Sequence, residues 1–178
     1  MELVVDFANT HVDRFGRVER FGDAAGLSAW LAEHGFAEAA SDATEADAAS
    51  ARELRDAVIT LLLSHSDDSE VSEQTRDETE DFLRRTALRY PLVAVANHDG
   101  ADLAPAHDGL PGAFGSVFAA VTKLGLKGSW SRLKACRNRG CHFAFLDRTR
   151  NASGAYCSGT CSSQVAMRKY RQRRRATS

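Results

Sequence analysis

Apolar residues recur at helical spacing in several parts of the chain. Within residues 45–65 the apolar positions Leu54, Val58, Leu61 and Leu62 lie three and four residues apart, and acidic residues occupy the first turn. This spacing places one apolar stripe on a helix, and acids near the start complement the helix dipole. The pattern therefore predicts a core helix over residues 45–65.

Further segments have the same period. "DAAGLSAWLAEHG" predicts a helix that Asp23 caps and Gly35 ends. "SEQTRDETEDFLRRTAL" predicts a more polar helix capped at Ser72, and "GAFGSVFAAVTKLG" predicts an apolar helix that Pro111 begins. After Cys161, "SSQVAMRKYRQRRRATS" predicts a short basic helix that frays at its end.

Two other segments have the character of β-strands. Leu3–Phe7 is apolar and β-branched, which predicts a short strand or an extended buried arm. "YPLVAVANHDGADLAPA" predicts a hairpin in which Leu92–Asn97 pairs with Asp102–Ala106 across a turn at "HDG". The expected fold class is thus α+β, a predominantly helical N-terminal domain with a short β-hairpin, followed by a small C-terminal module.

Length and composition are those of an ordinary globular protein. The chain has 178 residues, 43% of them hydrophobic, which suits one medium domain or one domain with a small module. The longest apolar run, Ala57–Leu63, is far shorter than the ~20 residues of a membrane helix, and the first residues lack the pattern of a secretory signal. We expect a cytoplasmic protein with no membrane partner.

Charge is strongly segregated along the chain. Residues 1–126 hold 23 acidic and 10 basic residues, whereas residues 127–178 hold 13 basic residues and a single acid, Asp147. The two parts carry charges near −13 and +12 although the whole chain is close to neutral. We place the domain boundary near Leu126, between an acidic domain (1–126) and a basic module (127–178) that is suited to a polyanion such as DNA.

The basic module contains all four cysteines of the chain, Cys136, Cys141, Cys157 and Cys161. Their spacing is Cys-x4-Cys-x15-Cys-x3-Cys, and two close pairs separated by about 15–20 residues are typical of a tetrahedral zinc site. Four thiolates leave no open coordination position, so such a site is structural and not catalytic. Zinc would also supply folding energy to a module with few large apolar groups.

The sequence leaves several alternatives to a four-cysteine zinc site open. The cysteines could form two disulfides, which the expected reducing compartment disfavours, or stay buried as free thiols. His142 could replace Cys141 as a ligand. Asp147 is expected to have a structural role, either in an ion pair with Arg148 or Arg150 or as an acceptor for backbone N–H groups before "NASG".

The same residues resemble the CGNR-type zinc finger of bacterial proteins. The Cys-x4-Cys pair, "FLDRTRN" at Phe145–Asn151, the Tyr156–Cys157 step and the lead-in "WSRLKAC" match that family's pattern. "VVDFANT" and "GLSAWLAEHG" are similar to the ABATE domain, which accompanies this finger and is linked to stress-induced transcription regulation. The name-giving Cys-Gly-Asn-Arg motif, however, reads Cys161-Ser162-Ser163-Gln164 here. The resemblance implies a zinc-binding regulator whose metal ligands are intact and whose polar groups after the last ligand are changed.

The cations that follow this motif are the expected contacts to DNA. Lysine and arginine neutralise phosphates, which gives affinity without sequence preference, although "RQRRR" alone could equally be a solvated tail. We expect a DNA-binding transcriptional regulator, in the form of a homodimer or a monomer. The predicted nucleic-acid-binding residues are Arg168, Lys169, Arg171, Arg173, Arg174 and Arg175.

The N-terminal domain offers a weaker candidate. Asp6, Asn9, Thr10 and His11 form a polar cluster that either lines a ligand pocket or satisfies its own backbone in a turn. This acidic domain has no metal-ligand cluster, no phosphate loop and no pair of nucleophile and base, so we expect no enzymatic activity and no catalytic residue. Two alternative functions remain, a protein-interaction adaptor whose zinc module packs on the acidic domain or a partner, and a small-molecule sensor.

Overall fold

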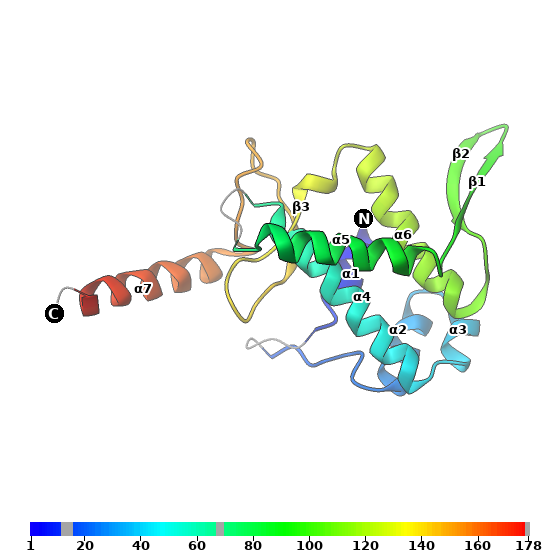
Figure 1. Ribbon diagram of the computed structural model, residues 1–178, viewed down its shortest axis with the longest axis horizontal. Helices are drawn as coiled ribbons and strands as arrows, with labels where there is room; N and C mark the ends of the chain where they lie inside the picture. The colour runs from blue at the N-terminus through cyan, green and yellow to red at the C-terminus, as the bar shows by residue number, and fades with distance from the viewer. Residues whose placement is uncertain (12–15, 67–69, 177–178) are drawn as a thin grey trace.

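Helices make up most of the computed structural model, which describes residues 1–11, 16–66 and 70–176. Figure 1 shows a helical body from which a β-hairpin projects at one end and the last helix at the other. The helices are α1 (Glu2–Ala8), α2 (Ala24–Glu33), α3 (Ala37–Ser41), α4 (Glu45–Ser64), α5 (Glu73–Ala87), α6 (Gly109–Leu126) and α7 (Gly159–Ala176), with a 3-10 turn η1 (Trp130–Arg132). The strands are β1 (Leu92–Asn97), β2 (Gly100–Pro105), β3 (Leu133–Ala135) and β4 (Ala144–Leu146).

Side-chain caps fix the starts of the helices that the sequence predicts. Asp23 accepts the N–H of Gly26 at 2.8 Å at the start of α2. Thr44 and Asp47 form a reciprocal capping box on α4. Ser72 caps α5 through the N–H of Thr75. These helices are confirmed within about two residues at each end, as is α6.

The first segment differs from the prediction of a strand or an extended arm. Residues 2–8 form helix α1, and its buried side chains are Val4, Phe7 and Ala8. Their spacing of three and four residues matches one face of a helix, whereas a strand would bury alternate residues. The apolar face packs into the core, so tertiary burial outweighs the β-preference of the two valines.

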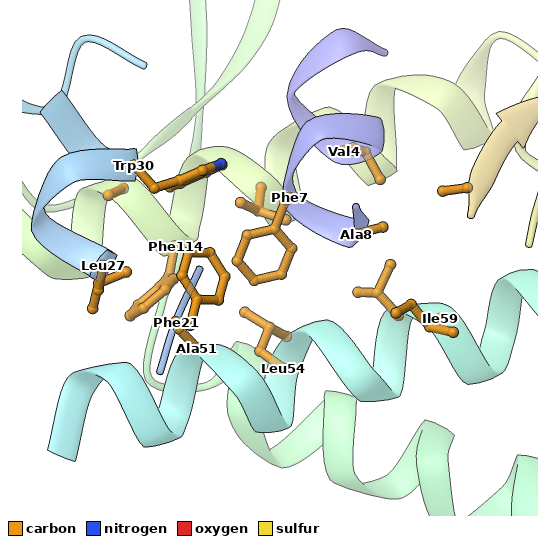
Figure 2. Packing of buried hydrophobic residues seen from close by; sticks show 14 of the residues in the cluster. Val4, Phe7, Ala8, Phe21, Leu27, Trp30, Ala51, Leu54, Ile59 and Phe114 are labelled. Atoms are coloured by element: carbon orange, nitrogen blue, oxygen red, sulfur yellow. The ribbon is translucent and has the colours of Figure 1, made fainter. Parts of the chain in front are cut away.

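Three aromatic rings from separate segments occupy the centre of the core. Phe7, Phe21 and Trp30 lie with ring centroids 5.5–5.6 Å apart, in tilted and edge-to-face contacts. Figure 2 shows them between α1, α2 and α4, with Leu54 of α4 beneath. Helix α4 packs against α1, α2, α5 and β3, so it is the central element of the body.

Helix α6 closes the other side of the core. Among the described residues it is the one helix long and apolar enough to span a membrane. It packs against α1, α3, β2 and η1, and Phe114 and Val117 are fully buried in the core. Pro105 of β2 packs closely on Gly115, which has no side chain; a Cβ at this glycine would lie 3.0 Å from the proline ring. These contacts are those of a core helix.

The predicted hairpin is present. Strand β1 has the predicted bounds, and β2 runs over residues 100–105, so that Asn97 pairs with Gly100 across a turn at His98 and Asp99. The Asn97 side chain accepts the N–H of Asp99 at 2.9 Å, which stabilises the turn.

A second hairpin, β3–β4, is absent from the sequence prediction and lies between the body and the cysteines. Leu133, Ala135 and Ala144 of this hairpin are fully buried and belong to the same apolar core as α1 and α4. His65 at the end of α4 contacts the Leu133 carbonyl at 2.7 Å. The basic module is therefore attached to the body by shared core packing.

Candidate metal centre

The four cysteines meet at one point although they come from two separate loops. Cys136 follows β3 and Cys141 precedes β4, whereas Cys157 precedes α7 and Cys161 lies in its first turn. All four Sγ atoms lie within 4.8 Å of one another. The Cys141–Cys157 and Cys157–Cys161 Sγ distances are 3.7 and 3.8 Å.

These distances discriminate between the alternatives for the cysteines. A disulfide requires about 2.05 Å between sulfurs, and all four residues are free thiols here. Four sulfurs at ~2.3 Å from one zinc ion would be about 3.8 Å apart, which the observed pairs match. The cluster comprises the four cysteines without His142, so the residues fit a closed zinc site with four thiolate ligands. Zinc bound there holds two loops together and supplies no open position for catalysis.

The burial of these thiols is consistent with a metal. Cys136 and Cys141 are buried, and burial raises the pKa of Cys136 to about 11 and moves that of Cys141 in the same direction. Burial acts to raise the pKa of Cys161, but hydrogen bonds with Asn138, Ser158 and the neighbouring thiols outweigh it and lower that pKa. A bound divalent cation would favour the thiolate form of all four cysteines and offset the repulsion between the thiolates.

The loop between the two cysteine pairs is organised around the buried carboxylate of Asp147. Lys134 of β3 donates to Asp147 at 2.9 Å, and both side chains are almost fully buried. Thr149 donates to it through its backbone N–H (2.9 Å) and its hydroxyl (2.7 Å), and Gly154 donates its N–H at 2.7 Å. Burial raises the pKa of Asp147, but these donors outweigh it and hold the pKa well below its usual range.

Asp147 therefore has the expected structural role, but its ion-pair partner differs from the predicted one. The prediction of backbone N–H donors is correct, whereas Lys134 and not Arg148 or Arg150 forms the ion pair. The arginines follow Asp147 directly along the chain, but the antiparallel pairing of β3 with β4 brings Lys134 across to it. The sequence alone does not predict this ion pair, because Lys134 and Asp147 are 13 positions apart.

Residues of the N-terminal segment hold the cysteine loop in place. Asn9 donates to the Ala144 carbonyl at 3.1 Å and accepts the Ala144 N–H at 2.7 Å, so its amide pairs with the edge of β4. His11 contacts the Cys141 carbonyl at 2.7 Å, and Arg17 donates to the same oxygen at 2.9 Å. The guanidinium of Arg17 also lies 4.7 Å from the Phe143 ring centroid.

The four residues predicted as a pocket are thus not directed to one point. Asn9 and His11 contact the basic module. Thr10 is buried and donates to the Phe7 carbonyl. A carboxylate oxygen of Asp6 lies 3.6 Å from Nε2 of His34. The alternative interpretation, a turn that satisfies its own backbone, applies to Thr10 and in part to His11, whose Nδ1 lies 2.9 Å from the Ala8 carbonyl oxygen. Arg17 is not among the predicted site residues, because nothing in the sequence marks a single arginine as a contact over 124 positions.

All six cations that are predicted to bind DNA lie on α7, and one of them contacts another part of the protein. Lys169, Arg171, Arg173, Arg174 and Arg175 are exposed. Arg168 is half-buried and donates to the side-chain oxygen of Asn138, which is fully buried between the first two cysteines. The Asn138 amide donates in turn to Gln164 at 3.0 Å. Gln164 and Arg168 therefore attach α7 to the first cysteine loop.

Comparisons with known proteins agree with this geometry. A family model named ABATE, described as "Putative stress-induced transcription regulator", matches residues 2–124. A model of the CGNR zinc finger matches residues 132–174. No curated protein matches the chain significantly.

Proposed function

The chain belongs to the ABATE family and carries a CGNR zinc finger, and on this premise we propose that it is a cytoplasmic, non-enzymatic regulator that binds DNA through α7. The observation that carries the proposal is the position of α7. This helix leaves the zinc site and extends away from the acidic body, with its cations in solvent (Figure 1). A basic helix that projects from a zinc-stabilised loop can approach a duplex without obstruction by the body.

The zinc site would hold the N-terminal end of α7 in place. Cys157 and Cys161 would bind the metal and so fix the start of α7, and the contacts of Asn138 with Gln164 and Arg168 hold its second and third turns. We assign Arg168 as a positioning residue, because its guanidinium is engaged with Asn138. The expected phosphate contacts are Lys169, Arg171, Arg173, Arg174 and Arg175.

Salt dependence of binding tests the proposal. Affinity for a fluorescein-labelled duplex, followed by anisotropy from low to high salt, should fall with a log–log slope of about −4.5 if all the expected cations each neutralise one phosphate. Arg171→Ala with Arg175→Ala, one helical turn apart, should reduce the slope by about 2. The matched control is Arg84→Ala with Arg85→Ala on α5 of the acidic body, which should leave the slope unchanged. Absence of binding at low salt contradicts the proposal.

An adaptor function is the second candidate. It is favoured by the extent to which the finger packs on its own acidic domain, through Leu133 and Ala144 in the core and through Asn9 at the edge of β4. Gln164, in the place of the motif's arginine, also makes an internal contact here. An adaptor predicts zinc-dependent folding without affinity for DNA, so the same titration separates the two functions.

A further inference from the structure

Among the described residues, no strand pairs with the outer edge of β1. The β1–β2 hairpin forms a two-stranded sheet, and β2 is the strand that packs on α6. Lys123 of α6 contacts Asp102 of β2 at 2.8 Å, which holds that strand. Val93 and Val95 of β1 are 44% and 46% exposed. A two-stranded hairpin with an apolar, exposed outer strand has little stability of its own.

The register of the hairpin shows which backbone groups face this edge. The Ala106 N–H donates to the Pro91 carbonyl at 2.9 Å, so these two residues form a hydrogen-bonded pair. Antiparallel strands alternate between hydrogen-bonded and non-hydrogen-bonded pairs, so Val93 and Val95 also bond toward β2. The N–H and C=O groups of Leu92, Ala94 and Ala96 consequently point outward along the open edge.

We propose that two copies of this chain pair through these edges, β1 against β1, to form a homodimer with a four-stranded sheet. Antiparallel pairing about a two-fold axis at Ala94 joins Ala94 to Ala94 of the second copy. It joins Leu92 to Ala96 of the second copy and Ala96 to its Leu92. This register satisfies every outward group of residues 92–96, and it places Val93 beside Val95 of the second copy on one face. A two-fold axis gives a closed assembly that stops at two copies.

The charges along β1 favour a second copy as the occupant. Natural sheet edges are protected by charged residues or prolines, whereas residues 92–97 contain neither. A neutral strand can pair with itself, because no like charges become opposed. The charged residues lie beyond its ends, Arg89 before the strand and Asp99 in the turn.

Sedimentation equilibrium of the full zinc-bound chain tests this assembly over a roughly hundredfold range of concentration. The wild-type chain should reach the mass of a dimer. Ala94→Lys places two ammonium groups against each other at the axis and should weaken the dimer at least about tenfold. The matched control is Ala101→Lys on β2, which adds the same charge to an exposed position away from the edge. Far-UV circular dichroism and thermal melting establish that both variants are folded.

A pair of charged variants tests the register, in which Leu92 lies opposite Ala96 of the second copy. Leu92→Glu with Ala96→Lys opposes unlike charges and should keep the dimer. Leu92→Lys with Ala96→Lys opposes like charges and should weaken it. A wild-type chain that stays monomeric, or a dimer that persists unchanged in Ala94→Lys, overturns the proposal. A dimer that is weakened by Ala94→Lys but is equally stable in the two charged variants overturns the Ala94-centred register.

Discussion

Replacement of Asp147 by asparagine should destabilise the finger more than its small change in volume suggests. The carboxylate is about 2% exposed and accepts hydrogen bonds from Lys134, Thr149 and Gly154. The asparagine side chain would keep one oxygen but present an NH2 group to an N–H donor in either orientation, because Thr149 N–H donates to one carboxylate oxygen and Lys134 and Gly154 donate to the other. The Lys134 ammonium would then stay buried without its counter-charge.

Removal of one partner of a buried ion pair costs about 3–5 kcal/mol, because the other charge is left uncompensated. We expect the lower part of this range, since Lys134 also donates to the Ala152 carbonyl. Total stabilities of small domains are about 5–15 kcal/mol, so the loss would be a large fraction of the whole. Replacement of both partners, Lys134→Met with Asp147→Asn, removes the unpaired charge and should cost less than the sum of the single changes.

Urea unfolding at neutral pH with excess zinc measures these free energies, with circular dichroism and the fluorescence of Trp30 and Trp130 as probes. A loss below about 1 kcal/mol for Asp147→Asn, or strict additivity in the double variant, would refute the reasoning. The pKa of Asp147 is lowered in the fold, so its stabilisation is complete above the unfolded value of about 3.9 and is lost as pH falls toward the folded pKa. The difference between wild type and Asp147→Asn should therefore shrink in acid.

Three further predictions concern the same module. A chelator, or Cys136→Ser, should remove one zinc per chain by elemental analysis and unfold the finger, as measured by the loss of amide protection from residue 133 onward. Gly154→Ala should lower stability by about 1–3 kcal/mol because its Cβ would lie 2.7 Å from an Asp147 oxygen, whereas Gly159→Ala has open space and should melt at or above the wild-type temperature. Asn9→Ala removes two hydrogen bonds to the edge of β4 and should accelerate hydrogen exchange at that strand without loss of zinc.

Helices with a clear apolar stripe and a capping residue could be predicted from the sequence because both signals are local. Residues 45–65 carry both, and α4 has nearly these bounds. Segment 2–8 has five apolar residues in seven, a run that gives no period to distinguish strand from helix. Its state depends on the aromatic core around Phe7, which is assembled from distant segments. Helix α3 is five residues long and is absent from the sequence prediction, since one turn leaves little periodic signal.

The candidate site divides in the same way. Cysteine spacing is a local signal, and it identified all members of the metal cluster. The partners that hold the cluster are 13 to 135 positions away, as Lys134 is from Asp147 and Asn9 from Ala144. Arg168 belongs to a residue type that often contacts phosphate, yet in the fold its guanidinium donates to the buried Asn138. Such contacts follow from the fold of the loop and not from residue type.

The acidic and basic parts of the chain are also separated in space, except where the basic module meets the body. Arg139 and Glu70 form an exposed ion pair at 2.7 Å where the basic module meets the acidic body. The distal arginines of α7 lie elsewhere, because the rise of about 1.5 Å per residue places Arg175 about 21 Å along the helix from Cys161. This distance exceeds the ~8 Å screening length at physiological salt, so the acidic body scarcely masks the end of α7. If the proposed function holds, a duplex drawn to these cations would meet repulsion where it approached the body, and the segregation would orient it toward the tip of α7.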